Sequence, residues 1–396
     1  MLKTETRIAP GRTATPRATA GIAVIWIDWY AYHVARFEGL VRHPELAGRV
    51  AGVELVGGIG VHAGLKFRED LPAALPVETL FPENSWREVK GWRAARAVWK
   101  YLDEVNPATV LVPGYHTAAG LAAALWGRLK GRRTVLMTES TATDHERRGS
   151  KEAAKGLLIR SLFDWAIAGG TPHRRYLEQL GFPAGRIAGS YDVVDNDFFR
   201  ERSAAIRKHS EPADFDLPAR YFLYVGRLAE EKNISGLLRS YLEYRQVGGD
   251  WALVLVGDGP ERSALEQTAA ESPYRGDIRF PGLKSTAELP QYYAFAGCFV
   301  LPSTREPWGL VANEAMAAGL PLIVSHRCGC AEDLLSEGEN GCSFDPAMPG
   351  DLTACLTAVG SLSEDSLLNM GRRSQEIVAQ FSPETWAAEV ARLARS

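Results

Sequence analysis

The sequence lacks several patterns that would assign it to common classes of protein. No G-x-G-x-x-G pattern follows a stretch that could form a strand, and the phosphate-binding pattern G-x-x-x-x-G-K-[ST] does not occur. These absences disfavour a dinucleotide-dependent dehydrogenase and a P-loop nucleotidase. The sequence also contains no run of about 18 apolar residues, so it predicts no membrane-spanning helix.

Cysteines and metal-ligand patterns are scarce as well. The chain has five cysteines, an odd number, and all of them lie in its second half, so no disulfide framework is predicted. Cys328 and Cys330 form a single C-x-C pattern, which we interpret as two buried thiols near a loop. No cluster of metal-ligand residues stands out, and we expect neither a metal nor another cofactor.

The chain is long enough for two domains. Its 396 residues are 46% hydrophobic and 23% charged, which is typical of a soluble globular protein. Residues 1–200 carry 27 Lys and Arg against 21 Asp and Glu, whereas residues 201–396 carry 18 against 27. The basic first half either faces an anionic partner or has a basic solvated surface. Residues 1–20 have no apolar core, so we predict an unstructured arm rather than a secretory signal, and a cytoplasmic location.

Short apolar stretches alternate with helical patterns along the rest of the chain. The expected strands are residues 23–27, 50–56, 109–112, 134–137, 165–168, 221–225, 252–256, 278–280, 298–301, 320–324 and 341–344. This alternation predicts βαβ units, parallel sheets and an α/β fold. The expected helix at residues 86–105 has one apolar stripe, formed by Trp92, Ala95, Trp99 and Leu102.

A stretch of mixed charge at residues 195–216 interrupts the alternation, and we place a domain boundary there. The prediction is an arm at 1–20, a Rossmann-like domain at 21–200, a second one at 201–380 and a helical segment at 381–396. Trp386, Val390 and Leu393 form one stripe of that segment, which predicts that it packs back on the first domain. Ligands of open parallel sheets bind at the carboxyl ends of the strands, so a deep cleft between the domains is expected.

Residues suited to a phosphorylated ligand follow the strands of the second half. Gly226 and Arg227 come directly after one strand, and Lys232 lies five residues later at the expected start of a helix. Arg227 offers a planar fork to a diphosphate and Lys232 a point charge, although two solvated cations explain the pattern equally well. Gly257 opens a Gly-Asp-Gly turn after the next strand, where backbone can approach a ligand closely.

Two carboxylates occupy one strand-loop-helix unit at residues 297–325. Glu306 lies in the loop, and Glu314 is expected in the first turn of the helix. Carboxylates accept hydrogen bonds from hydroxyls, and free N–H groups at a helix start bind negative charge. This combination fits a nucleotide-sugar, which has hydroxyls at both ends and negative charge between them. The alternative is an exposed loop carboxylate and a second one that favours the helix dipole.

Taken in order and spacing, these motifs resemble those of the retaining glycosyltransferases of family 4, among the glycosyl transferases of group 1, which have the GT-B fold. The motifs are Gly226-Arg227 with Lys232, Val256-Gly257-Asp258-Gly259-Pro260, Phe280-Pro281-Gly282, Leu301-Pro302-Ser303, and Glu306 with Glu314. The resemblance is strong over residues 220–345, weaker over 176–198 and faint before residue 105.

The resemblance implies a metal-independent donor site in the second domain and an acceptor site in the first. Arg227 and Lys232 would clamp the diphosphate of the donor, Glu314 would hold the ribose hydroxyls, and Glu306 would position the transferred sugar without acting as a nucleophile. Stabilising the charge that grows on the departing diphosphate would be the largest catalytic contribution. The backbone contacts to the donor would come from Gly226, Gly257, Gly282, Leu283, Trp308, Gly309, Leu310 and Val311. The D-x-D-like Asp195-Asn196-Asp197 is interpreted as a turn.

The first domain departs from the family pattern at two places. Family members usually carry a Gly-Gly loop after the first strand, where this sequence has His33 and Arg36. Many also have a histidine after the fourth strand, where this sequence has Glu139. Glu139 is therefore a candidate catalytic residue. His116 and His145 are further candidates on the acceptor side, although a single histidine is more often structural.

The resemblance implies transfer of a sugar from a UDP- or GDP-sugar to a glycan, lipid-linked or small-molecule acceptor, in the assembly of a cell-surface polysaccharide or glycolipid. Basic residues between 147 and 160, together with the tryptophan-bearing helix, indicate either contact with an anionic membrane or a solvated basic face. No nucleic acid is expected as a partner. The alternatives are a nucleotide-sugar epimerase that uses Glu139 and His116, and a non-catalytic nucleotide-sugar-binding subunit. A phosphorylase is disfavoured because no context for a pyridoxal lysine is evident.

Overall fold

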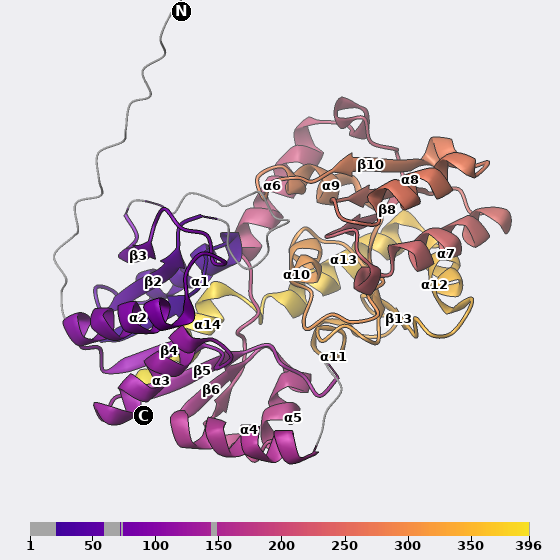
Figure 1. Cartoon of the computed structure of the whole chain (residues 1–396). Coiled ribbons are helices and arrows are strands. Elements are labelled where there is room, and N and C mark those ends of the chain that lie inside the picture. The colour runs from indigo at the N-terminus through magenta and orange to yellow at the C-terminus, as the bar shows by residue number, and fades with distance from the viewer. Residues whose placement is uncertain (1–20, 59–71, 73, 144–148, 396) are drawn as a thin grey trace, which may run out of the picture.

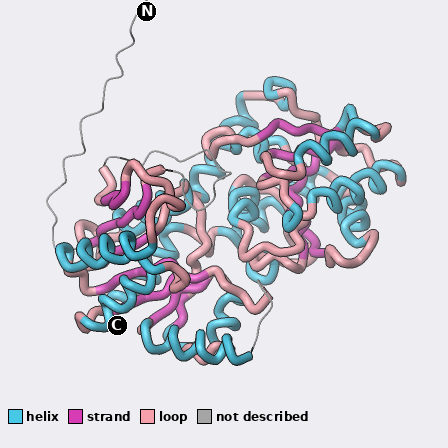
Figure 2. Tube along the Cα trace, in the orientation of Figure 1, coloured by secondary structure: helices cyan, strands magenta, loops and turns pink. Residues whose placement is uncertain are grey.

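The chain forms two parallel β-sheets, each covered by helices on both faces (Figures 1 and 2). The computed structural model describes all residues except 1–20, 59–71, 73, 144–148 and 396. The predicted arm at 1–20 and the candidate His145 lie outside this described part. Most strands of both sheets are those that the sequence marks by short apolar runs, and the predicted α/β architecture is confirmed.

The first sheet has seven strands in the order β3-β2-β1-β4-β5-β6-β7, all parallel. Its strands are β1 (Ile22–Trp26), β2 (Val50–Val56), β3 (Val77–Phe81), β4 (Thr109–Pro113), β5 (Arg133–Thr138), β6 (Trp165–Ala168) and β7 (Ile187–Ala188). The helices are α1 (Ala31–Arg42), α2 (Gly91–Val105), α3 (Ala118–Leu129), α4 (Gly149–Leu162) and α5 (Thr171–Gln179). The carboxyl ends of these parallel strands all lie at one edge of the sheet.

The second sheet has six parallel strands in the order β10-β9-β8-β11-β12-β13. Its strands are β8 (Tyr221–Val225), β9 (Ala252–Val256), β10 (Ile278–Gly282), β11 (Cys298–Leu301), β12 (Leu322–Ser325) and β13 (Gly341–Phe344). The helices after β7 are α6 (Asn196–His209), α7 (Ile234–Gln246), α8 (Arg262–Glu271), α9 (Leu289–Phe295), α10 (Leu310–Ala317), α11 (Ala331–Leu334), α12 (Asp351–Gly360), α13 (Glu364–Val378) and α14 (Pro383–Arg395).

The last helix, α14, returns to the first sheet and packs against α1, as the sequence predicts. The side chains of Trp386, Val390 and Leu393 are buried in the core that the first sheet forms with α1. The Asn196 amide, at the start of α6, donates to the carbonyls of Val378 and Phe381, both at 3.0 Å. These contacts fix the path of the chain as it crosses back.

The structure corrects the predicted face of α2. The helix begins at Gly91 rather than at residue 86, and Trp92 is 65% exposed. Its buried side chains are Ala94, Val98, Tyr101, Leu102 and Val105. This stripe follows the same helical period but faces the alanine-rich α3, with which α2 makes its most extensive contact. Of the predicted stripe, Leu102 is buried and Trp99 packs partly buried against the same core, so the prediction is wrong for Trp92.

Strands β3 and β7 and helix α6 are among the elements that were not predicted from the sequence. Strand β3 is half-buried at the sheet edge and β7 has only two residues, so neither has the fully apolar run typical of a buried parallel strand. Residues 196–209, within the stretch interpreted as a break, form the helix α6, which packs on α9 and α10. Asp195 is the N-cap of this helix and accepts from the Phe198 N–H at 2.9 Å, so residues 195–197 start a helix instead of forming a turn.

Candidate functional site

Three glycine-bearing turns stack backbone on backbone at the carboxyl ends of β8, β9 and β10. The Gly226 N–H donates to the Val256 carbonyl at 3.0 Å, and the Gly257 N–H donates to the Gly282 carbonyl at 2.9 Å. A Cβ atom on Gly257 would lie 1.8 Å from the Gly226 carbonyl oxygen, and Gly257 has φ +143°. No side chain fits at this position. Three of the sequence-predicted donor glycines, Gly226, Gly257 and Gly282, therefore lie together, and Gly257 and Gly282 are buried.

Both predicted clamp cations are paired with carboxylates. The ammonium of Lys232 contacts the carboxylate of Glu306, and these side chains are 20% and 11% exposed. The Ser303 hydroxyl also donates to Glu306, at 3.3 Å. Arg227 pairs with Glu231, a residue that the sequence reasoning missed although its four-residue spacing from Arg227 is a signal for such a pair.

The loop after β11 carries Glu306 and leads into α10. Gly309, with φ +106°, is the N-cap of that helix and has no side chain that could accept from the first-turn N–H groups. Trp308 is buried, and its indole N–H donates to the Asn313 side chain at 2.8 Å. Glu314 lies in the second turn of α10, not the first, and accepts a hydrogen bond from the Tyr293 hydroxyl at 2.7 Å.

The C-x-C pair lies beneath this loop. Cys328 and Cys330 are buried free thiols, which confirms their interpretation from the sequence. Cys328 forms an isolated parallel bridge with Glu306, and the Glu306 carbonyl accepts from the Gly329 N–H at 2.9 Å. The pair therefore supports the backbone of the loop that carries Glu306.

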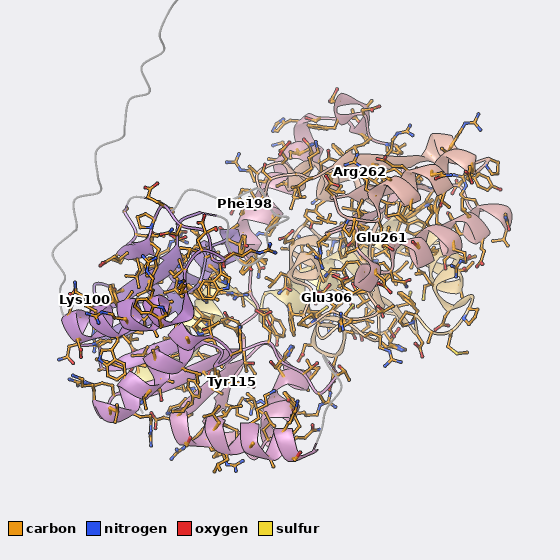
Figure 3. All side chains as sticks on the ribbon, viewed as in Figure 1. Lys100, Tyr115, Phe198, Glu261, Arg262 and Glu306 are labelled. Atoms are coloured by element: carbon orange, nitrogen blue, oxygen red, sulfur yellow. The ribbon has the colours of Figure 1, made fainter. Side chains whose placement is uncertain are left out.

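Side chains of the first half hold the same loop in place. The His173 imidazole is hydrogen-bonded to the Pro307 carbonyl at 2.9 Å. Thr171, at the start of α5, contacts the Asp333 carboxylate through its hydroxyl at 2.6 Å and its N–H at 2.8 Å. Glu306 lies on the side of the second half that faces the first (Figure 3). Sequence reasoning missed these contacts, because nothing in the local pattern pairs α5 with residues more than 100 positions away.

Of the candidates on the acceptor side, His33 and Arg36 are buried in α1. His33 is 8% exposed, its ring centroid lies 4.8 Å from that of Trp26, and its Nδ1 atom accepts from the Tyr30 N–H at 3.2 Å. Arg36 is fully buried and donates to Asp192 at 3.1 Å. His116 is exposed after β4. Burial gives His33 and Arg36 structural roles, and contact of these residues with an acceptor stays a prediction.

Asp192 makes hydrogen bonds with residues of both halves of the chain. Its carboxylate contacts Arg36, whose guanidinium carbon lies 4.2 Å from the ring centroid of Tyr191. Its backbone carbonyl accepts from the Asn313 side chain of α10 at 3.2 Å. Asn313 in turn accepts from Trp308, so the buried arginine of α1 is connected to the Glu306 loop through Asp192.

Glu139, the candidate that replaces the family histidine, lies beside Asp192. Burial, the charge of Glu139 and a hydrogen bond with Glu139 raise the pKa of Asp192 well above its ordinary value, although Arg36 opposes this. The Oδ2 atom of Asp192 is buried, and no N–H or hydroxyl of the described residues donates to it. A raised pKa favours the protonated form of a carboxyl group, and we predict that Asp192 shares a proton with Glu139.

Residues 206–376 match the family described as glycosyl transferases group 1. Among curated proteins, the chain is 32% identical over 193 residues to the sulfoquinovosyl transferase SQD2 of Arabidopsis thaliana. That alignment covers 48% of this chain and 34% of the plant protein. The chain therefore spans about a third of the length of this relative. The family match at residues 206–376 includes the glycine turns, Lys232 and Glu306.

Solved structures match the whole fold. The chain is similar to HepE of Anabaena in complex with UDP and glucose, with a TM-score of 0.70 and 16% identity over 95% of this chain and 100% of that one. It is also similar to the sucrose-phosphate synthase of Thermosynechococcus elongatus, with a TM-score of 0.72 and 20% identity over 95% and 98% of the two chains. These similarities confirm the predicted GT-B fold.

Proposed function

We propose that this protein is a retaining, metal-independent glycosyltransferase that uses a nucleoside-diphosphate-sugar. The observation that carries the proposal is the Lys232–Glu306 contact, which places one cation and one hydroxyl acceptor side by side in the half that also carries the stacked glycines. The match of residues 206–376 to glycosyl transferases group 1 supports it. Binding of UDP and glucose by the structurally similar Anabaena protein supports a UDP-sugar as the donor.

The donor diphosphate is proposed to bind between Lys232 and the start of α10. There it would replace Glu306 as the partner of the Lys232 ammonium, and the uncapped N–H groups of α10 would offer further donors. The Arg227 side chain is 54% exposed beside Glu231, and its guanidinium group can donate two hydrogen bonds to the same diphosphate. Diphosphate binding would release the Glu306 carboxylate, which can then accept hydrogen bonds from the sugar hydroxyls.

Transfer would proceed on one face of the sugar. The bond between the anomeric carbon and the diphosphate oxygen breaks, the acceptor oxygen bonds to the same face, and the diphosphate takes the acceptor's proton. Negative charge grows on the diphosphate in the transition state, where Lys232 and Arg227 stabilise it more strongly than in the ground state. In this scheme the Glu139 carboxylate, held by Asp192, lies on the acceptor side.

A panel of UDP-, GDP- and ADP-sugars without acceptor tests the proposed function. We expect slow release of free sugar and nucleoside diphosphate from one donor, unchanged by EDTA and abolished in the Lys232→Ala variant. Chromatography of the products provides the measurement. A new sugar isomer would instead assign an epimerase, and donor binding with no turnover even when acceptors are added would assign a binding subunit.

An anionic membrane surface is the proposed site of action. No helix of the described residues is long and apolar enough to cross a membrane. Leu121, Leu125 and Leu129 recur every four residues along α3 and are 37%, 45% and 67% exposed, and Leu157 of the basic helix α4 is 65% exposed. Exposed leucines flanked by Lys and Arg fit the interface of an anionic bilayer.

We expect the protein to sediment with anionic vesicles at low salt. Leu125→Glu/Leu129→Glu should reduce the bound fraction, because it adds two negative charges at the proposed contact. Leu368→Glu on α13 is the matched control, since Leu368 is also 53% exposed but lies on the second half. If the unmodified protein stays in the supernatant, the proposed membrane contact is wrong.

A further inference from the structure

A cavity of about 430 Å³ opens at the amino-terminal edge of the first sheet. Because the strands are parallel, this edge is opposite to the carboxyl ends that carry Glu139 and Asp192. The cavity lies between the end of α3, the turn into β5, the start of β6 and the turn before β7. Figure 1 shows α3 on the part of the first half that is remote from the second sheet. The lining side chains are Arg128, Arg132, Arg133, Asp164, Trp165 and Arg186.

The arginines of this cavity outnumber the carboxylates that could neutralise them. Asp164, the one acidic side chain of the lining, binds Arg128 at 2.7 Å, and its other oxygen accepts from the Thr134 N–H at 2.9 Å. Within the described part of the chain, no carboxylate lies within ion-pair distance of the other three arginines, which are Arg132, Arg133 and Arg186. The cavity therefore carries an excess of positive charge.

Two of these arginines are held in fixed positions by neutral groups. Arg133 donates to the carbonyls of Leu393 and Ala394 at the end of α14, at 2.7 and 3.0 Å. Arg132 donates to the side chain of Asn106 at 2.9 Å, but its Nε atom is buried and has no hydrogen-bond partner. Arg132 is thus held beside the cavity without a carboxylate partner among the described residues, and its charge is not neutralised there.

We propose that this arginine pocket binds a phosphate group, with the organic part of the ligand against the half-buried ring of Trp165. Guanidinium groups match the oxygens of phosphate by paired hydrogen bonds, and a cavity of this size can hold a phosphorylated small molecule. A soluble phosphate ester and the headgroup of an anionic lipid share this chemistry. The pocket is distinct from the proposed donor site, so the inference does not depend on the proposed function.

Binding of inorganic pyrophosphate, measured by titration calorimetry, tests the pocket. The Lys232→Ala variant serves as the background, because it weakens the proposed donor site. We expect this variant to bind pyrophosphate, and we expect Arg132→Gln and Arg186→Gln in that background each to weaken binding about tenfold, as loss of one charge-assisted contact predicts. Arg133 is left intact because it also holds the end of α14.

Arg275→Gln is the matched control, because Arg275 is exposed on the second half and no carboxylate of the described residues lies within ion-pair distance of it. Its pyrophosphate affinity should equal that of the Lys232→Ala background. Thermal melting of each variant verifies that the fold is retained. No pyrophosphate binding to the background, or equal affinity in the Arg132→Gln/Arg186→Gln variant, overturns the proposal.

Vesicles distinguish the two sources of the phosphate group. Vesicles of phosphatidylcholine with and without phosphatidic acid are sedimented with the intact protein and with the Arg132→Gln/Arg186→Gln variant. Capture by phosphatidic acid that the two substitutions abolish assigns a lipid headgroup to the pocket. Unchanged capture combined with lost pyrophosphate binding assigns a soluble phosphorylated ligand.

Discussion

Replacing Glu306 by glutamine is expected to lower kcat for sugar transfer about 100-fold while the affinity for the nucleoside diphosphate stays unchanged or rises. Glutamine keeps the volume but loses the charge, and two charge-assisted hydrogen bonds to sugar hydroxyls are worth about 3 kcal/mol or more. The affinity for the diphosphate should rise, because the Glu306 carboxylate competes with the diphosphate for the Lys232 ammonium and glutamine does not. Steady-state kinetics and calorimetric titration with the nucleoside diphosphate measure the two effects.

Glu314→Gln is the control for this division of roles. Glu314 lies on the next turn of the same unit and is proposed to hold the ribose, so its substitution should weaken nucleotide binding. If Glu306→Gln weakens nucleotide binding as much as Glu314→Gln does, Glu306 belongs to the nucleotide subsite. The assignment of Glu306 to the transferred sugar would then be wrong.

Removing the Asp192 side chain should destabilise the protein strongly, whereas making it neutral should not. Asp192→Ala leaves the buried Arg36 guanidinium without its side-chain hydrogen-bond partner, and a buried charged donor left unsatisfied costs about 3 kcal/mol or more. Asp192→Asn keeps an oxygen for Arg36 and places an amide N–H where the shared proton lies, so we expect a cost of about 1 kcal/mol. Urea unfolding followed by tryptophan fluorescence measures both.

The pH dependence of unfolding tests the protonation of Asp192 directly. Its pKa is raised in the folded state, so the stability it contributes is present below the ordinary carboxyl range near about 4 and is lost as the pH rises through the folded value. The Asp192→Asn variant has no carboxyl group to titrate at this position. Its free energy of unfolding should therefore change less with pH above the ordinary carboxyl range. The charged and titratable groups around Asp192 are Arg36, Glu139, Tyr32 and Tyr191.

Tyr32 and Tyr191 do not complicate this test. Burial raises the pKa of both hydroxyls, so they stay neutral throughout the range that matters. If Asp192→Asn destabilises the protein as much as Asp192→Ala does, Asp192 is charged in the folded state. The proton shared with Glu139 would then be excluded.

The sequence by itself determined where the strands of the second sheet lie, with exact bounds for some of them. The strands β8 and β9 have the predicted bounds because their fully apolar runs admit no other assignment between the flanking breaks. Gly257 and Gly282 could be placed in turns for a local reason as well, since both have a positive φ that disfavours any other residue. Short-range chemistry of this kind is readable in the order of the residues.

Only the tertiary structure decided which side chains become partners and which become buried. Lys232 and Glu306 are 74 residues apart, and Arg36 and Asp192 are 156 apart, so no periodic pattern connects them. The burial of His33 and Arg36 also has no signal in the sequence, because it results from the packing of their helix, α1, against α14. The burial of a charged residue is set by the packing of distant elements. This packing places Asp192, which the sequence did not single out, in contact with both Arg36 of the first half and Asn313 of the second.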